Sequence, residues 1–111
     1  MTSTVKLIEA AVLEINAGDH DSFGTLRVVG DGDRWVQYTP GMVNVAYPFD
    51  DPPTERLVSF SFTDVEEWTP GASAMIEIFL PEPDLAAWID RYFKEVLGCP
   101  ADYQLSWKRE Q

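Results

Sequence analysis

The chain has 111 residues, of which 45% are hydrophobic and 13% aromatic. This length predicts one domain, and the apolar content suffices for a packed core, which argues against a disordered chain. Nineteen acids against eight bases give a formal net charge of −11. Phosphate backbones and anionic lipid surfaces repel such a chain, so nucleic-acid and membrane binding are not expected. A basic protein or peptide is its electrostatic complement, although surplus charge can also serve solubility alone.

The amino-terminal residues and the single cysteine bear on the compartment. The segment MTSTVKLIEA lacks a basic region followed by a long apolar run, so no signal peptide is expected. No stretch approaches the ~18 apolar residues of a membrane span. Cys99 has no partner for an internal disulfide and is most simply a small buried residue. We therefore expect a soluble cytoplasmic protein.

The first predicted element is a helix over residues 4–17. Four apolar residues recur at spacings of three and four and so share one helical face: Val5, Ile8, Val12 and Ile15. Gly18 suits the end of this helix, because glycine adopts the left-handed conformation without strain.

Apolar alternation then predicts five consecutive strands, at residues 25–29, 35–38, 43–47, 58–62 and 74–80. In the clearest of them, 58–62, three apolar residues alternate with Ser59 and Ser61. The preceding PFDDPP (48–53) cannot lie in a central strand and is expected to be an exposed connection. TDVEE (63–67) is predicted to be a loop or a single helical turn.

The segments YTPG (38–41) and WTPG (68–71) share an aromatic residue followed by Thr-Pro-Gly. Proline presets φ at the second position of a type II turn, and glycine accepts the positive φ of the third. The first turn follows a clear strand, whereas the second follows the acidic TDVEE. We interpret the two segments as two turns without a duplication.

A second helix is predicted from Pro83 to Leu97, followed by a strand at 103–107. Its apolar stripe comprises Leu85, Trp88, Ile89, Tyr92, Phe93 and Val96. Short connections favour an antiparallel meander. The predicted fold class is α+β, a two-layer sandwich in the order α-β-β-β-β-β-α-β. About six mainly antiparallel strands carry both helices on one face.

The sheet face without helices is the candidate binding surface. In the predicted register it carries Trp35, Gln37, Met42, Asn44, Ser59, Ser61, Met75, Glu77 and Phe79. Aromatic and methionine side chains supply contact area, and amides and hydroxyls fix the register of a bound polypeptide. A helix, a terminal segment or a homodimer mate could equally cover this face, and a one-residue slip would exchange the two faces.

Acids beside aromatic residues and prolines form a second set of candidate contacts: Asp50, Asp51, Glu66, Glu67 and Trp68. On exposed loops they could hold a basic protein, or form only a solvated rim. Adjacent acids do not make the facing, pKa-shifted pair of a glycosidase. The sequence has no nucleophile elbow and no phosphate-binding glycine loop, so no catalytic residue and no enzymatic activity are expected.

The single histidine lies in DHD (19–21), between two carboxylates that could help it bind a metal. Neighbours in a row do not generally converge on one ion, and no further Cys or His cluster completes the shell. GDGD (30–33) is too short for a calcium loop. We expect no metal and no cofactor.

Two fragments, RWVQYTPG (34–41) and YFKEVLGCPADYQL (92–105), resemble pieces of the small bacterial domains related to type III secretion chaperones. The resemblance implies an acidic, non-enzymatic, peptide-binding α+β protein. The five consecutive strands and the terminal strand depart from the usual pattern of those chaperones. Size and acidity also resemble those of immunity proteins that neutralise bacterial toxins.

These features lead to the hypothesis of a module that sequesters or escorts a basic partner. One alternative is a small-molecule binder or minor enzyme that uses the open sheet face as a pocket floor. Another is a self-associating structural protein in which that face is the dimer interface.

Overall fold

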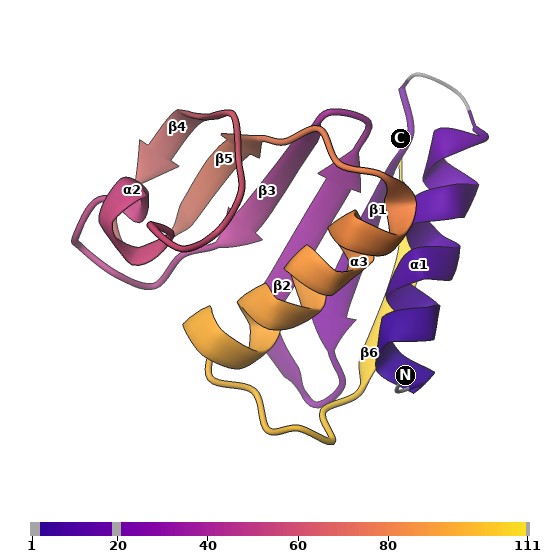
Figure 1. The fold of residues 1–111 in the computed structure, drawn as a ribbon. Coiled ribbons are helices and arrows are strands. Elements are labelled where there is room, and N and C mark those ends of the chain that lie inside the picture. The colour runs from indigo at the N-terminus through magenta and orange to yellow at the C-terminus, as the bar shows by residue number, and fades with distance from the viewer. Residues whose placement is uncertain (1–2, 19–20, 111) are drawn as a thin grey trace.

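The computed structural model describes residues 3–18 and 21–110. Its strands are β1 (Phe23–Val28), β2 (Asp31–Thr39), β3 (Met42–Ala46), β4 (Asp64–Thr69), β5 (Ser73–Glu77) and β6 (Leu105–Glu110). Its helices are α1 (Ser3–Asn16), α2 (Pro53–Arg56) and α3 (Glu82–Arg91), which continues into a π-helical turn at Tyr92–Val96. The strands form one antiparallel sheet in the order β4-β5-β3-β2-β1-β6, with the helices on one face (Figure 1). The predicted α+β class is confirmed.

The core lies between the sheet and the helices α1 and α3. Alternate residues of the central strands are almost completely buried: Leu26, Val36, Val43, Val45, Ala74 and Ile76. The helices meet them with Ile8, Val12 and Ile15 from α1, and with Leu85 and Ile89 from α3. Complete burial of each larger aliphatic side chain contributes about 1.5–3 kcal/mol. None of the helices in the described part of the chain is long and apolar enough to cross a membrane.

The predicted strand at 58–62 is wrong. The two prolines before it start the short helix α2, because their fixed φ suits a first helical turn. The chain then turns, so that Leu57 and Phe60, three residues apart, are buried while Val58 is 82% exposed. A spacing of three fits a turn and not a strand, in which Val58 would share the buried face of Phe60.

The fourth strand lies instead at β4, in the segment predicted to be a loop or helical turn. A bulge between Val65 and Glu67 inserts an extra residue into its pairing with β5. Val65 and Trp68 consequently oppose the buried Ile76 and Ala74, although they are three residues apart. The bulge removes the period-two alternation by which a strand is recognised in a sequence.

The predicted meander is only partly correct. Strands β1, β2 and β3 are consecutive neighbours, but β3 pairs with β5, and β4 forms the edge. Residues 47–63 carry the chain from β3 to this edge, so the connection is not short. The two edges of the sheet are therefore β4 and β6.

Both Thr-Pro-Gly segments close β-hairpins. Gly41 and Gly71 have φ values of 84° and 74°, the positive values predicted for the third position of a type II turn. In the first hairpin Thr39 pairs directly with Met42. In the second, Thr69 pairs with Ser73, which makes the loop one residue longer. The second turn thus also follows a strand, contrary to the expectation.

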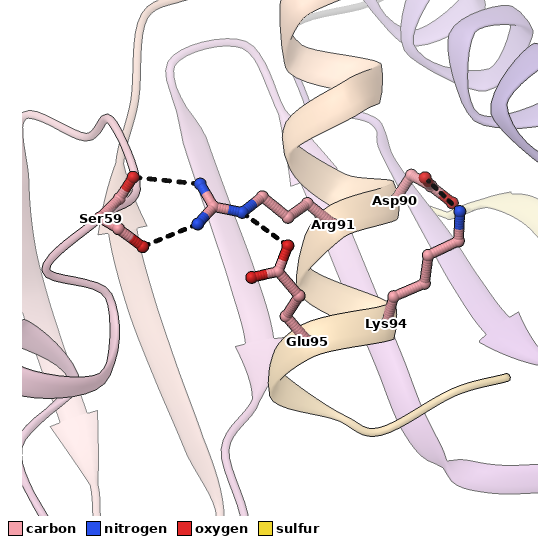
Figure 2. Close-up of polar contacts among 5 residues, drawn as sticks. All are labelled: Ser59, Asp90, Arg91, Lys94 and Glu95. Atoms are coloured by element: carbon pink, nitrogen blue, oxygen red, sulfur yellow. Dashed lines mark hydrogen bonds and ion pairs between the residues drawn. The ribbon is translucent and has the colours of Figure 1, made fainter. Parts of the chain in front are cut away.

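Arg91 on α3 holds the segment 57–61 against the helix (Figure 2). Its guanidinium donates hydrogen bonds to the carbonyl oxygen and the hydroxyl of Ser59, at 3.0 and 2.7 Å. It also pairs with Glu95 at 2.9 Å and lies 4.0 Å from the centroid of the Phe60 ring. Contacts with the Arg91 side chain therefore position this segment, whereas the predicted strand would have been held by backbone hydrogen bonds to a neighbouring strand.

Arg91→Ala is expected to lower the free energy of unfolding by about 1–2 kcal/mol, because the Ser59 carbonyl loses a charged donor. Lys94→Ala on the same helix is the matched control. Its ammonium makes an i,i+4 ion pair with Asp90 at 3.0 Å, a kind of pair that contributes about 0.3–0.5 kcal/mol (Figure 2). Urea unfolding of both variants measures the difference, and equal losses would contradict the anchoring role of Arg91.

Candidate functional site

The sheet face opposite the helices is named here the open face, and none of the described helices lies on it (Figure 1). Its central row crosses all six strands, with each residue paired to the next: Lys108, Thr25, Gln37, Asn44, Met75 and Glu67. A second row, one step along the strands, comprises Thr39, Met42, Glu77 and Asp64. Both rows are mainly polar, and Met75 and Met42 are their apolar members.

The strand ladder places most of the predicted face residues where the register expected them. Gln37, Asn44 and Met75 lie in the central row, and Met42 and Glu77 lie in the second row. Trp35, two positions before Gln37 on β2, is opposite Arg27 and is partly buried.

Three other predicted residues lie away from these rows. Phe79 follows the end of β5, is 70% exposed and covers Gly41, where an added Cβ would lie 2.9 Å from the phenyl ring. Ser59 and Ser61 belong to the segment held by α3 and not to the sheet. Their predicted place on the open face is therefore wrong.

The predicted acidic contacts lie on three different parts of the molecule. Asp51 is held in an ion pair with Arg56 at 2.9 Å. Asp50 is exposed in the connection between β3 and α2. Glu66 and Glu67 lie on β4 and not on a loop, and only Glu67 has a partner in the ladder, Met75. Glu67 is the member of this set that joins the open face.

Trp68 faces the helix side of the sheet, opposite Ala74. Its ring meets the Tyr47 ring edge-on, with centroids 6.4 Å apart. Its indole N–H is buried without a hydrogen-bond partner among the described residues. The ring of Trp68 therefore packs beneath the sheet, although Trp68 also contributes to the lining of one hollow of the open face.

A chain of hydrogen bonds runs along the central row. The Asn44 amide donates to Gln37 Oε1 at 3.2 Å, and the Gln37 amide donates to Thr25 Oγ1 at 3.4 Å. The Thr25 hydroxyl in turn donates to the Glu110 carboxylate. Each bond orients the next group in the chain. The side-chain oxygen of Asn44 does not take part in these bonds and can accept a hydrogen bond from a partner. The amides are thus held in one arrangement before any partner binds.

The carboxylate at the end of this chain is stabilised in its charged form. The Thr25 hydroxyl is the main reason that the pKa of Glu110 lies below its usual value, and Lys108, 3.3 Å away, adds to the effect. Sequence reasoning missed both Thr25 and Glu110. The alternation around Leu26 could have placed Thr25 on this face, but nothing in the sequence pairs β1 with β6.

Two adjoining hollows lie in the open face. The apolar hollow, of about 200 Å³, has Phe23, Tyr38, Met42 and Met75 as its apolar lining and Asp21, Ser22, Gln37, Thr39 and Asn44 as its polar lining. The acidic hollow, of about 130 Å³, is lined by Asn44, Glu67, Trp68, Thr69, Ser73 and Met75. Asn44 and Met75 belong to both. Methionine side chains adapt to differently shaped partners, so the shared wall can adjust to what binds.

The charges of the molecule are distributed unevenly. Between Arg56 and Arg91 there is no basic residue, while seven acids occur: Asp64, Glu66, Glu67, Glu77, Glu82, Asp84 and Asp90. None of the six ion pairs in the described part of the chain involves an acid of β4 or β5. Asp64 and Glu77 are even directly opposite each other. Such a like-charge pair destabilises a sheet unless a cation from outside compensates it.

Among the described residues, the candidates for metal and covalent chemistry form no common centre. Across residues 3–18 and 21–110, no group of three or more His, Cys, Asp or Glu side chains is placed to hold a metal ion. Asp19 and His20 of the DHD segment lie outside the described residues. Cys99 is buried, as expected, and burial raises the pKa of its thiol. A thiol with a raised pKa is a weak nucleophile near neutral pH.

No protein-family model, curated protein or solved structure matches this chain. The resemblances to secretion chaperones and to immunity proteins therefore stay predictions.

Thr25→Val is expected to raise the pKa of Glu110, because it removes the hydrogen bond that most favours the carboxylate. The ¹³C shift of the Glu110 carboxyl, followed against pH, measures this change. Because the folded-state pKa is depressed, the stability that this group adds is present at higher pH and is lost as the pH falls through that pKa. Lys108→Met is the control and should raise the pKa less. An unchanged pKa in Thr25→Val would contradict the hydrogen-bonded chain.

Proposed function

We propose that this protein is a non-enzymatic docking module that binds a basic protein or peptide on the open face of its sheet. The observation that carries the proposal is that this face combines hollows with a β4–β5 hairpin whose carboxylates have no cation among the described residues. A basic partner supplies the missing charge and covers the apolar surface at the same time.

Charge favours a basic partner over the other classes. The net charge of −11 steers a cationic protein toward the acidic hairpin and raises the association rate. The like-charge pair of Asp64 and Glu77 is relieved when a cation lies beside it. Self-association is disfavoured by the same charge, because every copy carries it.

The size of the hollows favours a polypeptide over a small molecule. Volumes of about 200 and 130 Å³ fall below the ~300–1,000 Å³ of typical ligand pockets. They suit single side chains of an extended segment. The preoriented amides of Gln37 and Asn44 can fix the position of such a segment, while Met42 and Met75 supply contact area. Sequestering or escorting a basic partner is the role that this arrangement supports best.

Met75→Arg tests the docking surface, because it places bulk and positive charge between the two hollows. Random peptides displayed on phage are first selected on the wild-type protein, and their binding to the variant is then measured by calorimetry. We expect basic peptides that bind Met75→Arg at least about tenfold more weakly, a loss of ~1.4 kcal/mol. Their wild-type affinity should fall as salt is added.

Ala10→Arg is the matched control, since it changes the net charge equally on the exposed side of α1. Equal loss of binding in both variants, or selection of neutral or acidic peptides, would contradict docking on the open face. Sedimentation tests the other possible occupant of the open face, a second copy of this chain. A wild-type dimer that Met75→Arg converts to a monomer would assign the face to a second copy of this chain.

A further inference from the structure

We infer that the two hollows of the open face form a two-part specificity site for an extended segment. The apolar hollow receives an aliphatic side chain, and the acidic hollow receives a Lys or Arg side chain two positions away in the same segment. This inference rests on the proposed docking function and names the pattern of side chains that the partner must carry.

The spacing of the hollows sets the distance between the two partner side chains. Because the hollows share Asn44 and Met75, their occupants lie next to each other across neighbouring strands. Adjacent strands are about 4.8 Å apart, and residues i and i+2 of an extended chain project to the same side about 6.6 Å apart. Residues i and i+1 project to opposite sides, so they cannot fill both hollows. A segment that crosses the strands therefore presents alternate residues to this face.

The linings determine which side chain enters which hollow. Phe23, Tyr38, Met42 and Met75 make most of the surface of the apolar hollow apolar, although Asp21 is also in its lining, and this surface favours an aliphatic group. In the acidic hollow, the methylene stem of a Lys can lie along Met75 while its ammonium reaches Glu67. The hydroxyls of Ser73 and Thr69 are further acceptors for that ammonium.

Glu67 and its neighbour Glu66 provide an internal comparison. Both are exposed acids of β4 and contribute equally to the net charge. Only Glu67 lines the acidic hollow and lies opposite Met75. Glu66 is the extra residue of the bulge and has no partner in the ladder. A direct contact with the partner's cation should therefore depend on Glu67, whereas long-range attraction should depend on both.

The test uses two capped eight-residue peptides of identical composition and charge. One repeats Leu-Ser-Lys-Ser, which places Leu and Lys on the same side of an extended chain. The other repeats Leu-Lys-Ser-Ser, which places them on opposite sides. Each is titrated into the ¹⁵N-labelled wild-type protein and into Glu67→Gln and Glu66→Gln, and the amide shifts give both the affinity and the binding surface.

We expect the first peptide to bind the wild-type protein about fivefold more tightly, the effect of one exposed ion pair. Shifts should be centred on Asn44 and Met75. The preference should disappear in Glu67→Gln and persist in Glu66→Gln. Equal binding of the two peptides, or equal effects of the two variants, overturns the two-part site while leaving docking on the open face intact. If the phage selection yields basic peptides but neither repeat peptide binds, the two-part site is wrong and the docking function stands. If the selection yields no basic peptides and neither repeat peptide binds, the proposed docking function is wrong as well.

Discussion

One-sided burial is the constraint on which the rest of this structure depends. The helices α1 and α3 cover a single face of the sheet, so the central strands direct most of their apolar residues to that side. Leu26, Val36 and Val43 do so and are almost completely buried. Since strand side chains alternate, the residues between them are forced onto the opposite face. Gln37 and Asn44 are therefore only partly buried, by the same geometry that buries their neighbours completely.

The connection from β3 to β4 turns this exposed face into a site. It is held by two tyrosine hydroxyls, which donate to backbone carbonyls: Tyr92 to Ala46 at 2.7 Å and Tyr47 to Asp51 at 2.6 Å. By carrying the chain past β5 to the sheet edge, the connection lets β5 insert beside β3. Met75 and Asn44 meet only because of this arrangement, and both hollows depend on their contact.

The acidic hairpin places stability and binding in opposition. Directly opposed carboxylates and an edge strand without an internal cation weaken the folded state. The same charges protect the edge against pairing with other strands, and the bulge in β4 adds to that protection. A basic partner relieves the repulsion between these carboxylates. The part of the sheet whose charges destabilise the isolated protein is therefore the part that a basic partner stabilises most.

The sequence by itself determined the faces of the regular elements, because helical and strand periodicities report which side chains meet the core. Val12 and Ile15 marked the inner side of α1, and the alternation from Ala74 to Phe79 assigned both sides of β5. Those patterns sufficed for the α+β class and for five residues of the open-face rows: Gln37, Met42, Asn44, Met75 and Glu77. The tertiary structure alone decided the strand order, the true position of the fourth strand and the joining of Thr25 to Glu110. Each depends on contacts between distant segments or on a bulge that erases the local period, and neither leaves a signal in a short window of sequence.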